Sequence, residues 1–195
     1  MKAKKVLALV LCAALLVAGS VAATLAYLTS KTEVVTNTFS VGNVTITLDE
    51  AKVDENGKAV NGDRVTENSY KLIPGHEYDK DPTVHVAAGS EESWLFVKVV
   101  DEIAAIQDAT TVADQMAANW TLVSGQTNVY AYKTTVVGGE DVDVFDGFKI
   151  KSDVKNDELA TYAGKTITVQ AYAVQADGFD TAAEAWGEAP CTWGE

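Results

Sequence analysis

The chain has two histidines, His76 and His85, and they are the first candidates for chemistry. Glu77 follows His76, and histidine beside glutamate is the combination that zinc peptidases use. A helical zinc site needs its two histidines one turn apart, whereas Pro82 lies between these two, so an HExxH helix is excluded. On adjacent strands the two imidazoles could still share a metal with one of three nearby carboxylates, Glu77, Asp79 or Asp81. We keep His76, Glu77 and His85 as weak metal candidates against the simpler expectation of surface histidines, and predict no cofactor.

Other reactive residue types lack partners at catalytic spacing. Cys191 lies in the C-terminal tail, and neither a Gly-x-Ser-x-Gly motif nor a phosphate-binding loop is present. Acidic clusters such as residues 140–143 lack the spacing of a calcium-binding EF-hand. We therefore predict no catalytic residues and a protein that is not an enzyme. A metal-dependent endopeptidase remains the least favoured alternative.

The first 26 residues have the pattern of a secretory signal peptide. Lys2, Lys4 and Lys5 precede an apolar run from Val6 to Ala18, and small residues follow. The small side chain of Ala26 favours cleavage between Ala26 and Tyr27, with a second option three residues earlier. The alternative is an uncleaved anchor, since a membrane helix needs about 20 apolar residues. We expect a signal-peptide helix over residues 1–26, a signal peptidase as partner during export, and a secreted or cell-surface protein.

The charge of the remaining chain restricts its partners. Residues 27–195 keep 12 basic and 28 acidic residues, a net charge of −16. Such a surface repels nucleic acid and anionic lipid, so we predict no nucleic-acid partner. The length suits one domain with its own core. One cysteine remains in this part, so the domain cannot form an internal disulfide.

Alternating apolar and polar residues dominate the pattern and predict β-strands. Ile167, Val169, Ala171 and Ala173 alternate with polar residues, for example, so one face of that strand is apolar. The predicted strands cover residues 44–48, 83–86, 94–100, 129–137, 143–151 and 166–175. Together they indicate an all-β fold, an antiparallel β-sandwich of jelly-roll or immunoglobulin-like type with a few short helices.

Turn and cap residues mark the connections. Asn56-Gly57 and Asn61-Gly62 favour left-handed backbone and suit hairpin tips, so residues 51–70 are predicted to form a hairpin excursion. Short helices are expected to begin near Thr111, at Asn156 or Asp157, and at Thr181, where Glu184 completes a capping box; this last helix should end at Gly187. Most aromatic residues fall on predicted strands and are expected in the core. Trp186 and Trp193 do not, which hints at an exposed interaction surface.

Three blocks of the sequence resemble the TasA/camelysin family of secreted Gram-positive proteins. The first covers residues 19–48, including Thr36-Asn-Thr-Phe39 and Val41-Gly-Asn-Val44. The second covers residues 74–100, with Pro74-Gly75 and Lys80-Asp81-Pro82, and the third covers residues 171–186. The resemblance implies a jelly-roll domain, exported through a dedicated signal peptidase and assembled into fibres of the biofilm matrix.

The resemblance also implies how subunits would join. In such fibres the mature N-terminal segment of one subunit completes the sheet of the next, and by position residues 27–35 would be that donor strand. Leu28, Val34 and Val35 are the apolar candidates for its pockets. We expect self-association into fibres, with companion matrix or cell-surface proteins as further partners. The rival hypothesis is a monomeric adhesin that presents loops such as residues 51–70 or 101–128.

Overall fold

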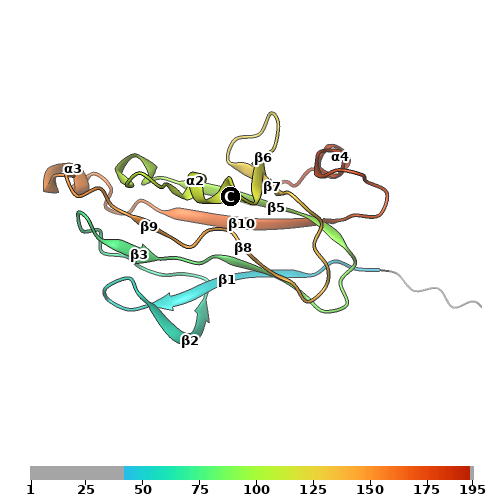
Figure 1. The fold of residues 1–195 in the computed structure, drawn as a ribbon, viewed down its shortest axis with the longest axis horizontal. Helices are drawn as coiled ribbons and strands as arrows, with labels where there is room; N and C mark the ends of the chain where they lie inside the picture. The colour runs from blue at the N-terminus through green and yellow to red at the C-terminus, as the bar shows by residue number, and fades with distance from the viewer. Residues whose placement is uncertain (1–41, 194–195) are drawn as a thin grey trace, which may run out of the picture. The chain divides into compact units, whose positions relative to one another are not determined.

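A computed structural model describes residues 42–193, which belong to one compact unit, Val41–Glu195 (Figure 1). The predicted signal-peptide helix, the cleavage position between Ala26 and Tyr27, and the donor residues Leu28, Val34 and Val35 lie outside the described residues. No helix between residues 42 and 193 combines the length and the apolar character that crossing a membrane requires.

The described chain consists mainly of antiparallel strands with a few short helices, which confirms the predicted all-β class. The strands are β1 Ile46–Val53, β2 Ala59–Val65, β3 Glu77–Asp79, β4 Thr83–Val86, β5 Ser93–Asp101, β6 Trp120–Leu122, β7 Val129–Tyr132, β8 Asp141–Asp143, β9 Gly147–Lys149 and β10 Ile167–Gln175. The helices are the 3₁₀ turn η1 Ala104–Ile106, α2 Val112–Met116, α3 Asn156–Ala160 and α4 Ala182–Glu188.

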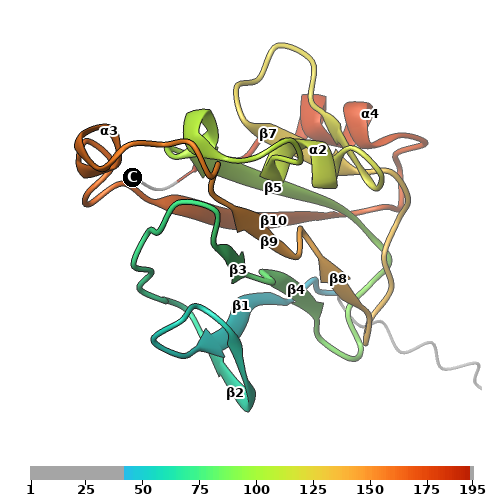
Figure 2. The ribbon, with the colours of Figure 1, turned by 60° about the vertical axis from the view of Figure 1, so that its left-hand side comes forward.

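Two four-stranded sheets form two layers. One has the strand order β2-β1-β4-β8 and the other β10-β5-β7-β6, while β3 and β9 pair separately. In Figures 1 and 2 the layer of β5 and β10 lies on one side of the unit and the layer of β1 and β4 on the other. Fully buried side chains from both layers, including Val84, Leu95 and Val97, meet in one core.

The register between β5 and β10 explains the apolar face predicted for β10. Ala171 pairs with Val97 and Ala173 with Leu95, and these residues point into the core between the sheets. Tyr172 pairs with Phe96, and both point to the opposite face of the sheet. Because side chains alternate along a strand, β5 supplies apolar residues to two separate clusters.

The second cluster lies on the outer face of the β5–β10 sheet and is covered by α4. Trp186 is 8% exposed and packs on Phe96, with ring centroids 5.1 Å apart. The capping box predicted for this helix is present, since the Thr181 side chain accepts from the Glu184 N–H and the Glu184 side chain accepts from the Thr181 N–H. The expectation that Trp186 is exposed is therefore wrong, because the apolar face of α4 packs on the sheet and buries this side chain.

Some boundaries differ from the sequence prediction. The strand predicted at 143–151 is divided into β8 and β9 by residues 144–146. The second of these strands begins at Gly147, where a Cβ atom would meet the Tyr78 carbonyl oxygen at 2.3 Å. Asn56-Gly57 forms the predicted β1–β2 turn, but Asn61-Gly62 lies within β2, beside an irregular stretch of register. The helix α3 begins after Lys155 without a side-chain cap, so Asn156 and Asp157 are not its N-caps. The helix α4 runs through Gly187 to Glu188.

Candidate functional site: a groove between two sheet edges

Two sheet edges face each other at one side of the core. Among the described strands, β10 has a single neighbour, β5, and so forms the edge of its sheet. In the opposite sheet the first half of β1 pairs with β4 through residues 46–49, whereas β2 joins β1 only from Glu50 onward. An edge strand exposes backbone N–H and C=O groups to any further strand that approaches it.

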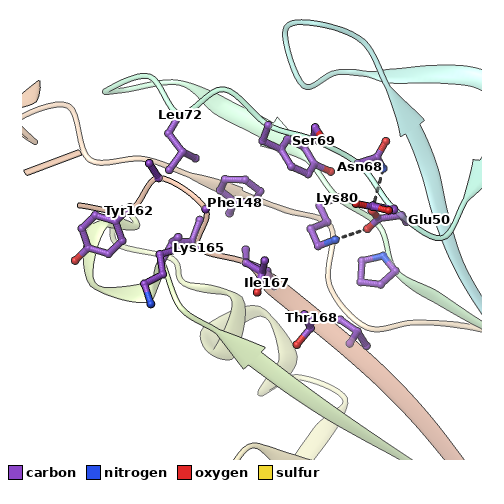
Figure 3. A pocket seen from close by; sticks show the side chains of 18 of the residues that line it. Glu50, Asn68, Ser69, Leu72, Lys80, Phe148, Tyr162, Lys165, Ile167 and Thr168 are labelled. Carbon is purple, nitrogen blue, oxygen red and sulfur yellow. Dashed lines mark hydrogen bonds and ion pairs between the residues drawn. The ribbon is translucent and has the colours of Figure 1, made fainter. Parts of the chain in front are cut away.

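A groove of about 1160 Å³ lies between these edges (Figure 3). Its walls come from the start of β10, the middle of β1, the segment 65–72 and the α3 region. Figure 3 shows Tyr162 and Lys165 at one end of the groove and Glu50, Lys80 and Asn68 at the other, with Ile167 and Phe148 between them. The groove thus has an apolar middle and a charged end.

The apolar middle is core surface that no described strand covers fully. Leu48 of β1 and Ile167 and Val169 of β10 pack against the central core, yet each remains partly exposed. By contrast Val99, the register partner of Val169 on β5, is 5% exposed. Burying such side chains releases about 25 cal/mol for each Å² of apolar surface, so this strip of the core favours a covering segment.

The charged end is built around Glu50, which is 5% exposed. One oxygen, Oε2, accepts from the Nζ of Lys80, and the other, Oε1, accepts from Nδ2 of Asn68 at 3.0 Å. Lys80 is itself only 9% exposed. A buried charge must be paired and hydrogen-bonded to be tolerated, and this carboxylate has both kinds of partner.

Local strand geometry places these groups. Ile46 and Leu48 point into the core, and the same alternation turns Glu50 inward two residues later. The side-chain amide of Asn68 then takes the place of a neighbouring strand: Oδ1 accepts from the Val53 N–H at 3.0 Å, and Nδ2 donates to the Ala51 carbonyl at 2.8 Å. Sequence reasoning missed this site, although continuing the alternation from Leu48 to Glu50 would have indicated an inward carboxylate.

His85 lies on the outer face of the first sheet, away from the core side. Its Nε2 lies 2.9 Å from Asp49 Oδ1 and its Nδ1 lies 2.6 Å from Asp141 Oδ1. Hydrogen bonds to Asp49 and then Asp141 raise the pKa of His85, despite partial burial. Arg64 binds Asp49 on the same face, and its Nη1 lies 3.0 Å from Asp81 Oδ2. His85 on β4 therefore connects β1 and β8 through its hydrogen bonds to Asp49 and Asp141.

The other predicted metal candidates take different partners. The Nε2 of His76 is 2.7 Å from the Asn56 carbonyl oxygen, and its ring lies 4.6 Å from that of Tyr78. Glu77 is exposed on β3. Across residues 42–193, no group of three or more histidine, cysteine, aspartate or glutamate side chains is arranged to hold a metal ion. The two histidines therefore contact different residues, and the described structure does not bring His76, Glu77 and His85 together as metal ligands.

Comparison of the chain with known protein families, characterised proteins and solved structures finds no match. The resemblance to the TasA/camelysin family therefore stays a prediction from the residues quoted above.

Proposed function

We propose that this protein is a secreted structural subunit that assembles by accepting an extended strand from a neighbouring copy into the groove between β1 and β10. The observation that carries the proposal is the pair of facing sheet edges with partly exposed core residues between them. A strand added to an edge gains backbone hydrogen bonds, and its alternate side chains enter the apolar middle. Export after cleavage at Ala26 would make the segment beginning with Tyr27 available.

The proposed donor is residues 27–35. This segment has nine residues, which equals the length of β10. With side chains alternating, Leu28 and Val34 would face the groove together, while Val35 would face outward. Its one lysine and one glutamate cancel, so the segment is uncharged overall, whereas residues 42–193 carry most of the chain's acidic excess. An uncharged arm can approach such a domain without the repulsion that two domains exert on each other.

The assembly that follows is open-ended. The donor of each copy enters the groove of another, so the contact is head-to-tail and the copies form a filament instead of closing as a two-fold dimer. We further propose that the domain is a jelly roll whose sheet is completed in this way, and that the filament serves an extracellular matrix of a Gram-positive cell, as the family resemblance implies. Companion matrix proteins could end or decorate such filaments through the same edge.

The test compares the mature chain, residues 27–195, with a version that begins at residue 36. We expect concentration-dependent polymers from the first and monomers from the second, measured by light scattering and electron microscopy. Val169→Asp places a charge in the groove and should also stop assembly. Leu122→Asp on β6, at the far edge of the same sheet and 55% exposed, is the matched control and should assemble normally.

Two results would contradict the proposal. Equal assembly by the version that begins at residue 36 would exclude the donor segment. A mature chain that stays monomeric over all concentrations, including mildly acidic solutions that reduce its charge repulsion, would favour the monomeric adhesin.

A further inference from the structure

Three side chains at the charged end of the groove form a chemically suggestive triad. An amine, Lys80 Nζ, and a carboxamide nitrogen, Asn68 Nδ2, are hydrogen-bonded to the two oxygens of one carboxylate, Glu50. The side chains of Lys80 and Glu50 are 10% and 7% exposed. Lysine amines are nucleophiles toward carbonyl carbons when they lose their proton, and a carboxylate between donor and leaving group can carry that proton.

We propose that Lys80 and Asn68 join through an isopeptide bond between Lys80 Nζ and Asn68 Cγ, formed within the folded chain with Glu50 as the catalytic acid and base. The ammonium of Lys80 passes one proton to Glu50 Oε2, and the free amine attacks Asn68 Cγ. Glu50 then passes this proton to Asn68 Nδ2 as the Cγ–Nδ2 bond breaks, and takes a second proton from the attacking nitrogen. One molecule of ammonia leaves, and no oxidant, metal or external co-reactant is needed.

The existing hydrogen bonds suit each stage of this reaction. Asn68 Oδ1, where negative charge develops during the attack, accepts from the Val53 N–H at 3.0 Å. A backbone donor fixed at a developing oxyanion is a strong form of transition-state stabilisation. The leaving nitrogen Nδ2 already donates a hydrogen bond to Oε1 of Glu50, so the same carboxyl group needs only to turn its Oε2 proton toward Nδ2 to protonate it. The amide is therefore held with its oxygen against a donor and its nitrogen against an acid.

Aromatic rings lie beside the triad on one wall of the groove. The ring of Tyr70 packs edge-on against Tyr78 and Phe148, with centroids 5.8 and 5.4 Å away, and its hydroxyl donates to the Asp79 carbonyl at 3.0 Å. Burial, with a smaller contribution from the charge of Glu50, raises the pKa of Tyr70. These rings lower the local polarity beside the triad, which strengthens the electrostatic interactions between its groups.

The bond would fix a segment that is held by side-chain contacts and loop hydrogen bonds instead of strand pairing. Residues 66–76 contain no strand or helix, yet residues 65–72 form one wall of the groove. A covalent link from Asn68 to Lys80 closes this segment into a loop and lowers the entropy of the unfolded chain, as a disulfide would in a domain that has none. The link does not depend on strand acceptance, so either proposal can fail alone.

The test is the intact mass of the folded mature chain, residues 27–195. We expect a mass lower than that of the sequence by one ammonia. Trypsin should fail to cut after Lys80 and should yield a branched peptide that joins residues 65–71 to residues 72–98. Lys80→Arg keeps the positive charge but removes the nucleophile, and Glu50→Gln keeps the shape but removes the base. Both variants should retain the unmodified mass, with folding verified by circular dichroism.

A second source of the same mass loss must be separated. Asn56-Gly57 and Asn61-Gly62 can each lose ammonia by forming a succinimide, without any involvement of lysine. If Lys80→Arg shows the same loss as the unaltered chain, or if the unaltered folded chain keeps its full mass after prolonged incubation, the proposed bond is refuted.

Discussion

The most informative perturbation is a pair of valine truncations at positions that face each other across two strands. Val169 on β10 pairs with Val99 on β5, and both point into the central core. Val99 is 5% exposed, whereas Val169 borders the groove and is only half-buried. The two substitutions Val169→Ala and Val99→Ala remove the same atoms, so their effects differ only through what covers each side chain.

The expected magnitudes follow from burial. Removing two carbons from a fully buried valine costs about 1.6 kcal/mol in transfer free energy, and about 2–3 kcal/mol once the cavity is included. In the subunit that begins at residue 36 we expect about this loss of unfolding free energy for Val99→Ala and about 1 kcal/mol for Val169→Ala. When a strand covers Val169, its cost should approach that of Val99. At the lower end of this range the difference is about 1 kcal/mol, which corresponds to about a fivefold weaker affinity for the strand.

The assay uses a synthetic peptide with the sequence of residues 27–35. Urea unfolding gives the stability of each variant without peptide, and calorimetric titration gives its affinity for the peptide. Val169→Ala should weaken peptide binding about fivefold, and Val99→Ala, which is already covered, should leave it nearly unchanged. If both variants bind the peptide equally well, or if Val169→Ala destabilises the free subunit as much as Val99→Ala, the groove is not the site that the peptide covers.

Two further predictions concern the other faces of the domain. Because hydrogen bonds to Asp49 and Asp141 raise the pKa of His85, this histidine stabilises the fold fully below its unfolded pKa of about 6.5 and loses that contribution as pH rises through the higher folded value. Urea unfolding at several pH values should show that His85→Gln removes this pH dependence of the unfolding free energy. The change should be less than about 1 kcal/mol, because the Asp141 side chain is largely exposed. If the unfolding free energy of His85→Gln varies with pH as in the unaltered chain, His85 does not bridge the strands. Trp186→Ala should lower the unfolding free energy by about 3–5 kcal/mol while leaving peptide affinity unchanged, because α4 covers the face opposite the groove; a change in affinity would mean that the two faces are coupled.

Sequence periodicity predicted those strands whose two faces differ in environment. In β10 the apolar positions Ile167, Val169, Ala171 and Ala173 all pack toward the central core, as the alternation indicated. The helix start near Thr111 and the capping box at Thr181 were also predicted, because a side-chain cap is a local interaction between residues three positions apart. Not every local prediction was right, since neither Asn156 nor Asp157 caps α3.

The remaining features depend on contacts between distant parts of the chain. At the start of β9, Gly147 lies against the Tyr78 carbonyl of β3, and no local pattern around residue 147 reveals this close approach. The groove requires knowing that β10 has one strand neighbour and that β1 changes partners along its length. The triad likewise joins residues 50, 68 and 80 from three segments. Its only local clue was a glutamate on the apolar side of an alternating strand.

The long ladder between β5 and β10 has a mechanical consequence. Its nine residue pairs run in unbroken register from Ile167–Asp101 to Gln175–Ser93, and their hydrogen bonds lie perpendicular to the strands. Tension applied along the axis of β10 would load these bonds in shear, so that they resist together, whereas a pull across the sheet would open them one after another. In the proposed filament, β10 would therefore stay anchored to its own subunit under any load that acts along its axis.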